Sequence, residues 1–206
     1  MKAAIHALKY GRLQPAALRL GRMLAKAIAQ LAGDAPTEML VVPVPLHRSK
    51  YAERSFNQAQ ALAEHALASL RKTHPEWRLT LDSKILMRRR ATESQAGLTP
   101  RQRRLNVKGA FTVSDPAAVK LKHVLIIDDI FTTGSTARAA AQALTKAGAA
   151  SVWVATLARA RRVHDNRRNV PFSLDDGENN LTPAGKSPAV TLQGASIYSL
   201  DEQSSF

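Results

Sequence analysis

Alternating apolar and polar stretches divide this chain into predicted helices and strands. From Pro15 to Leu31, apolar side chains recur at the spacing of one helix face, and the segment Gly33–Pro36 ends that helix. An alanine-rich segment, residues 137–147, predicts a second helix that ends at Gly148. Short apolar runs bounded by turn residues predict buried strands at residues 39–44, 124–127 and 152–157. Strands that alternate with helices predict a doubly wound α/β domain with a mainly parallel sheet.

Weaker patterns predict further elements between these. They are a helix capped by Asn57 or Ser55 and running to Leu70, strands within Trp77–Leu86 and Gly109–Val113, and a short helix at Pro100–Leu105 capped by Thr99.

The last part of the chain differs from the rest in composition. Residues 1–164 form one predicted domain, whereas residues 165–206 contain scattered Pro, Gly, Ser and Asn with little periodicity. This composition predicts a mostly disordered C-terminal tail. A short strand at 190–192 or 197–200 is an open alternative within it.

The densest chemical pattern is VLIIDDIFTTGST, residues 124–136. A buried strand ends in two acids, and a turn of small hydroxyl residues then leads into a helix. Backbone N–H groups of such a turn can converge on an anion at the positive end of the helix. Carboxylates suit ribose hydroxyls or a Mg²⁺ held partly through water. The predicted ligand is a phosphorylated ribose, bound by Asp128, Asp129, Thr132, Thr133, Gly134, Ser135 and Thr136.

This stretch resembles the 5-phosphoribosyl-1-pyrophosphate (PRPP) signature of type I phosphoribosyltransferases. The resemblance implies the fold of that family. A rival interpretation, the magnesium strand of an NTPase, lacks its phosphate loop, because no G-x-x-x-x-G-K-[ST] segment occurs in the chain.

Two basic segments are further candidates in view of that resemblance. In type I enzymes the loop after an early strand binds pyrophosphate, and Leu46–Ser49 stands there, with His47 and Arg48 as candidate contacts. Such enzymes also close a flexible loop over PRPP, which excludes water from the reacting carbon. The segment from Lys84 to Lys108 would supply that loop through Arg88, Arg89, Arg90, Arg101 and Arg104. A solvated basic face or a nucleic-acid patch is the alternative.

Composition indicates which ligands and which cellular compartment suit the chain, but it does not choose between these interpretations. The formal net charge is +14, and the excess lies before residue 165, which suits nucleic acid or pyrophosphate-bearing ligands. The absence of cysteine excludes disulfides and thiolate zinc sites. No run of about 18 apolar residues occurs, so neither membrane insertion nor a signal peptide is expected and a cytoplasmic location is predicted.

Three blocks in order, VVPVPLHRSKYAERSFNQAQALA, RRRATESQAGLTPRQRRLNVKGAF and the signature, resemble the ComF/GntX-like family of competence-associated phosphoribosyltransferase-like proteins. The resemblance implies a setting in DNA uptake. One departure stands out, since family members commonly begin with a four-cysteine zinc-binding segment and this sequence contains no cysteine.

Taken together, the sequence predicts a PRPP-binding protein that transfers or senses phosphoribosyl groups. The favoured interpretation is an enzyme with Asp128, Asp129 and Arg90 as catalytic residues. Mg²⁺ is the implied cofactor, carried by PRPP rather than held by direct protein ligands, with Asp128 and Asp129 as the alternative contacts. The second hypothesis is a non-catalytic accessory protein that binds single-stranded DNA and keeps a vestigial or sensory PRPP site. Competence proteins are possible partners under either hypothesis.

Overall fold

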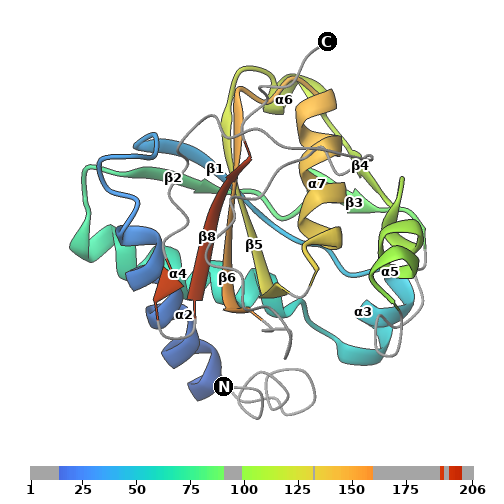
Figure 1. The fold of residues 1–206 in the computed structure, drawn as a ribbon. Helices are drawn as coiled ribbons and strands as arrows, with labels where there is room; N and C mark the ends of the chain where they lie inside the picture. Colours follow the sequence, from blue (N-terminus) through green and yellow to red (C-terminus); the bar gives the residue numbers. More distant parts are fainter. Residues whose placement is uncertain (1–13, 91–98, 132, 160–190, 193–194, 201–206) are drawn as a thin grey trace, which may run out of the picture.

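The computed structural model describes residues 14–90, 99–131, 133–159, 191–192 and 195–200 (Figure 1). Its centre is a sheet with the strand order β2-β1-β5-β6-β8-β7. The pairs β1–β2, β1–β5 and β5–β6 are parallel, and β8 runs antiparallel to β6 and β7. The strands are β1 (Glu38–Pro43), β2 (Arg78–Leu81), β5 (His123–Phe131), β6 (Ser151–Arg159), β7 (Thr191–Leu192) and β8 (Ala195–Leu200). The predicted α/β fold with a mainly parallel sheet is confirmed.

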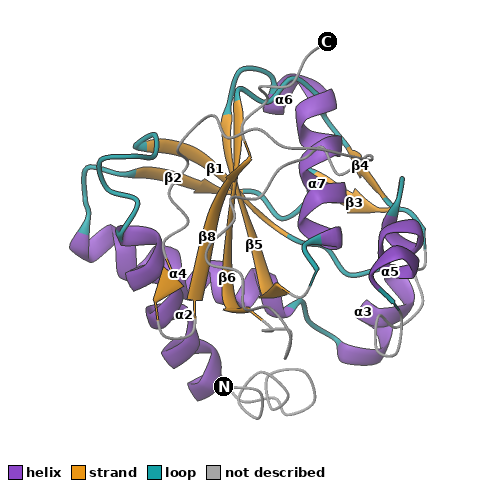
Figure 2. Cartoon of the chain, viewed as in Figure 1, coloured by secondary structure: helices purple, strands orange, loops and turns teal. Residues whose placement is uncertain are grey.

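Helices α2 (Gln14–Ala29) and α4 (Gln58–Thr73) cover one face of this sheet (Figure 2). Leu125 and Ile127 of β5 pack into the same core as the apolar faces of these two helices. The two helices pack closely at Gly21, where an added Cβ atom would overlap the Cβ atom of His65. Glycine is therefore the residue that this helix crossing requires.

Helix α7 (Ser135–Lys146) covers the opposite face, beside a separate antiparallel ribbon of β3 (Leu86–Arg88) and β4 (Phe111–Val113). Val124 and Ile126 of β5 pack into this second core. Alternate residues of the central strand thus face opposite layers, as a strand buried on both sides requires. Short helices α5 (Pro100–Val107) and α6 (Pro116–Val119) complete this side.

Most elements match the sequence prediction. The predicted cap of α5 forms a reciprocal pair, in which the Thr99 N–H donates to Gln102 Oε1 (2.8 Å) and the Gln102 N–H donates to Thr99 Oγ1 (3.3 Å). Asn57, rather than Ser55, caps α4, since its Oδ1 accepts from the Ala59 N–H (3.1 Å). Gly148 has φ +92°, as expected just after the end of α7.

Two predictions need correction. The polar segment after β1 forms helix α3 (Arg48–Arg54) instead of a continuous loop. The single strand expected within Trp77–Leu86 is two strands in two sheets, β2 and β3. The cause is Asp82, whose Oδ1 accepts from the N–H groups of Lys84 (2.7 Å) and Ile85 (3.1 Å) and so turns the chain between them.

The C-terminal part is described only in β7 and β8. The strand left open at residues 197–200 is present as β8, which extends the sheet beyond β6. The prediction of a disordered tail otherwise concerns residues 165–190, 193–194 and 201–206, which lie outside the described residues. No helix in the described part of the chain combines the length and apolar character needed to cross a bilayer.

Candidate functional site

The carboxyl ends of β1 and β5 meet at one edge of the sheet. The Val44 N–H, just beyond β1, donates to the carbonyl oxygen of Ile127 at 2.9 Å. The Asn57 side chain donates to the carbonyl oxygen of Val44 at 3.0 Å and so joins the first turn of α4 to the same place. In open α/β sheets, ligands bind at this edge.

Asp128 and Asp129 continue β5 directly at this edge, and both side chains are half-buried. The Asp128 carboxylate accepts a hydrogen bond from the Asp129 N–H at 2.9 Å. Strand alternation places Asp128 on the face covered by α7 and the β3–β4 ribbon. Its register partner on β6 is Thr156, a fully buried polar residue that the sequence analysis did not single out.

The hydroxyl-rich turn leads straight into α7. Gly134 is the N-cap of α7, with φ +73° and ψ +2° in the left-handed region that favours glycine. The Thr133 and Ser135 hydroxyls are hydrogen-bonded to each other at 2.7 Å, and the Ser135 N–H points to Thr133 Oγ1 at 3.4 Å. A glycine cap has no side chain to satisfy the first amides of the helix, which suits an anion there. Thr136 is the next residue of the helix, and Thr132 lies outside the described residues.

The loop after β1 is shorter than predicted. His47 is the N-cap of α3, where its Nδ1 accepts from the Ser49 N–H (3.3 Å) and lies 2.9 Å from Ser49 Oγ. Arg48 is the first residue of α3 and is exposed. Both predicted contacts therefore lie beyond the end of β1, on a short helix rather than on a loop.

Arg88 is not on a loop but is the last residue of β3. Its side chain is half-buried, with the guanidinium carbon 5.5 Å from the centroid of the Phe111 ring on β4. Burial lowers the pKa of the Arg88 guanidinium below its ordinary value, and the negative charge of Asp128 acts in the opposite direction. Sequence reasoning had grouped Arg88 with mobile arginines and missed its proximity to the signature.

The other arginines of the predicted loop occupy defined positions. Arg89 Nε donates to Thr112 Oγ1 at 3.1 Å across the ribbon. Arg90 Nη2 donates to the carbonyl oxygens at the end of α5, namely those of Leu105 (3.2 Å), Asn106 (2.9 Å) and Lys108 (3.1 Å). Arg101 and Arg104 belong to α5 itself, and residues 91–98 lie outside the described residues. A catalytic role for Arg90 stays a prediction, because its cation is here directed to a helix C-terminus.

Because Arg90 contacts the end of α5, substitution can test whether its role is structural or catalytic. We expect Arg90→Met to lower the free energy of unfolding by about 1 kcal/mol, because three carbonyls at the end of α5 lose a charged donor. Urea denaturation measures the change, with the exposed Arg101→Met on the same helix as control. Stability equal to that of the control, together with lost turnover, would instead favour the predicted catalytic role.

The acidic residues near the end of β5 indicate how the protein could bind the Mg²⁺ that the resemblance implies. The described residues contain no group of three or more His, Asp or Glu side chains that could hold a metal ion. The carboxylate oxygens of Asp128 and Asp129 suit a hard cation that keeps most of its ligands on water or on a bound pyrophosphate. The residues present therefore fit a metal delivered with the ligand.

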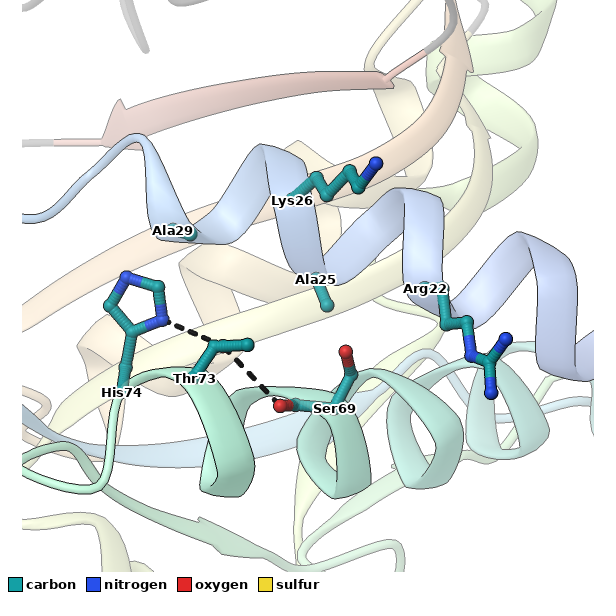
Figure 3. Close-up of a pocket in the computed structure, with 7 residues that line it drawn as sticks. All are labelled: Arg22, Ala25, Lys26, Ala29, Ser69, Thr73 and His74. Atoms are coloured by element: carbon teal, nitrogen blue, oxygen red, sulfur yellow. Dashed lines mark hydrogen bonds between the residues drawn. The ribbon is translucent and has the colours of Figure 1, made fainter.

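A separate pocket lies away from the signature (Figure 3). It has a volume of about 210 Å³ and lies between α2 and the last turns of α4, lined by Arg22, Ala25, Lys26, Ala29, Ser69, Thr73 and His74. His74 Nδ1 is 2.8 Å from Thr73 Oγ1, and Thr73 Oγ1 donates to the carbonyl oxygen of Ser69 at 3.3 Å. None of the sequence-predicted site residues lines it.

The mainly parallel sheet with helices on both faces, two acids in its central strand and a glycine-capped helix after them are the features that bear on the family of this chain. The chain belongs to the phosphoribosyl transferase domain family, which matches residues 16–185. The family resemblance found in the sequence is thereby confirmed.

Curated relatives carry names from DNA biology. DNA utilization protein YhgH of Escherichia coli (strain K12) is 36% identical over 157 residues, which cover 75% of this chain and 65% of that protein. Competence protein F of Haemophilus influenzae is 32% identical over 125 residues, 58% of this chain and 50% of that protein. Competence protein ComFC of Streptococcus pneumoniae is 32% identical over 122 residues, 59% and 49% respectively. The chain thus spans about 65% of the length of the first of these relatives.

Among solved structures, a hypoxanthine phosphoribosyltransferase from Staphylococcus aureus is similar with a TM-score of 0.41 and 19% identity, over 76% of this chain and 70% of that one. The assignment of the fold rests on the family match and on the strand order.

Proposed function

We propose that this protein binds PRPP, or another ribose 5-phosphate ligand, at the carboxyl end of β5. The observation that carries the proposal is the direct succession of two half-buried carboxylates and a glycine-capped helix N-terminus with hydroxyls around it. Asp128 and Asp129 would accept hydrogen bonds from the ribose hydroxyls. Thr133, Ser135 and the first amides of α7 would hold the 5-phosphate.

Phosphoribosyl transfer is the reaction that this arrangement supports. Fixing the 5-phosphate and the diol orients the anomeric carbon for loss of pyrophosphate through an oxocarbenium-like state. The two carboxylates, bound to the diol, would place negative charge close to the sugar on which positive charge develops. Mg²⁺ bound with the pyrophosphate would supply the charge that stabilises the leaving group. Arg48 is exposed at the start of α3, after the end of β1, and is the proposed protein cation for the leaving pyrophosphate.

One assay tests the reaction and the acceptor together. Pyrophosphate release from PRPP is measured with the protein and Mg²⁺ in the presence of purine and pyrimidine bases, amines and single-stranded DNA. Release that depends on one acceptor class supports transfer and identifies that class. PRPP binding without release from any acceptor would favour a sensor, and absence of binding would contradict the proposal.

A second candidate function is binding of single-stranded DNA. It is favoured by the net charge of +14 and by relatives named for DNA utilization and competence. Helix α5 has no acidic residue in its first turn, and Arg101 and Lys108 on and just after it are exposed.

This candidate predicts a strong dependence on salt. Affinity for an oligonucleotide should fall with ionic strength, and Arg101→Met with Lys108→Met should reduce the logarithmic slope by about 0.7 for each lost phosphate contact. Fluorescence anisotropy across a salt series measures it, with Arg22→Met and Lys26→Met on α2 as the charge-matched control. Equal slopes for the two double variants would show that α5 makes no specific contribution.

A further inference from the structure

The β3–β4 ribbon approaches the signature from the layer that contains α7. Leu86 of β3 and Phe111 of β4 belong to the same core as Phe131, the last residue of β5. The ribbon and one face of β5 thus contribute to the same core, in the layer that contains α7. Side chains alternate between the two faces of β5. Ile127 faces the core formed with α2 and α4, so Asp128 faces the layer of α7 and the ribbon.

Arg88 is the cation that the ribbon brings to this place. Its register partner on β4 is Phe111, and its guanidinium lies over the ring of that residue at 5.5 Å. Planar stacking on an aromatic ring restricts the guanidinium more than a solvated position would. Burial lowers the pKa of the Arg88 guanidinium, and the negative charge of Asp128 opposes this, as expected for opposite charges in one layer.

We propose that Arg88 is a positioning residue for ribose recognition, which holds the Asp128 carboxylate in the orientation that accepts the sugar hydroxyls. This inference rests on the proposed function and adds a residue from a different sheet to its site. The Asp129 N–H already fixes one oxygen of Asp128 at 2.9 Å. A second, cationic neighbour on the ribbon leaves the carboxylate less freedom to turn away from the ligand.

The proposal distinguishes Arg88 from a residue that contacts the ligand's phosphate. If Arg88 acts through Asp128, its loss weakens ligands that carry ribose hydroxyls and leaves binding of inorganic phosphate unchanged. If it contacts phosphate directly, both kinds of ligand weaken together. Ribose 5-phosphate and inorganic phosphate are therefore the two probes.

The experiment compares Arg88→Met, Arg88→Lys and Arg71→Met in the full chain by calorimetric titration, with NMR for the more weakly bound phosphate. Arg88→Met should weaken ribose 5-phosphate about tenfold while inorganic phosphate changes less than about twofold. Arg88→Lys should recover only part of the affinity, because it keeps the charge but loses the planar stacking on Phe111. Arg71→Met, at an exposed arginine in the last turn of α4, is the charge-matched control and should bind as the unaltered protein does.

A double-mutant cycle completes the test. In the Asp128→Asn background, Arg88→Met should have no further effect on ribose 5-phosphate affinity. An unchanged affinity in Arg88→Met, additive losses in the cycle, or equal loss for both probes would each overturn the inference. Failure of the unaltered protein to bind ribose 5-phosphate would instead refute the proposed function itself, so the two failures are distinguishable.

Discussion

Replacement of both signature carboxylates, Asp128→Asn with Asp129→Asn, is expected to lower PRPP affinity by at least about 100-fold. Each carboxylate can accept from a ribose hydroxyl with a full negative charge, whereas an amide is a weaker acceptor and presents a donor at one of its two positions. A site built to hydrogen-bond a hydroxyl discriminates strongly once its groups are mismatched. Calorimetric titration measures the loss.

The double variant should remain folded. The side-chain amide introduced by Asp128→Asn keeps a carbonyl oxygen that can accept from the backbone N–H of position 129, which the structure shows bonded to Asp128 Oδ1 at 2.9 Å. Both side chains are only half-buried, so the stability change should stay within about 1–2 kcal/mol. Thermal unfolding provides this control. Retained PRPP affinity in a folded double variant would show that the ribose binds elsewhere.

The largest expected effect on stability comes from Gly21→Ala. In an exposed helix this substitution would stabilise by about 1 kcal/mol through helix propensity. Here the new methyl group would overlap the Cβ atom of His65 and lie 3.2 Å from the Ala66 backbone nitrogen. Overpacking of this kind costs about 1–3 kcal/mol or more, and backbone of a packed helix cannot yield as a flexible side chain does. A net destabilisation of about 2 kcal/mol is expected from urea denaturation.

His65→Gly provides the matched test of the cause. It removes the Cβ atom that Gly21→Ala would meet, at a cost of about 1 kcal/mol for a glycine inside α4. In that background the effect of Gly21→Ala should shrink markedly, because the two sites are in direct contact. A stabilised Gly21→Ala protein, or additive effects in the cycle, would mean that the two helices are farther apart than described.

The central strand and its helix could be predicted because local sequence determines them. The run from Val124 to Ile127 is apolar on both faces, and all four side chains are buried in the structure. Gly134 and Gly148 mark the two ends of α7 with positive φ, a conformation that glycine adopts without strain. The hydroxyl-rich turn lies between such elements, so its place at the sheet edge follows from the pattern.

Other features depend on contacts that a linear pattern does not contain. Helix α3 has no apolar period, and its start is fixed by the His47 side chain acting as the cap. The division between β2 and β3 depends on the turn at Asp82. Arg88 resembles its neighbours in sequence, and only the fold brings the ribbon and one face of β5 into the same core, where the charge of Asp128 acts on Arg88. For residues whose sequence context allows several structural roles, tertiary packing thus determines which role is adopted.

The central claim is that one ligand places its diol at Asp128 and Asp129 and its phosphate at the start of α7. Calorimetric comparison of ribose 5-phosphate with 2-deoxyribose 5-phosphate tests it most directly, because the two sugars differ by a single hydroxyl. We expect ribose 5-phosphate to bind at least about tenfold more tightly, since loss of the 2-hydroxyl leaves a carboxylate without its donor. Equal affinity for the two sugars, or binding of neither, would contradict the account.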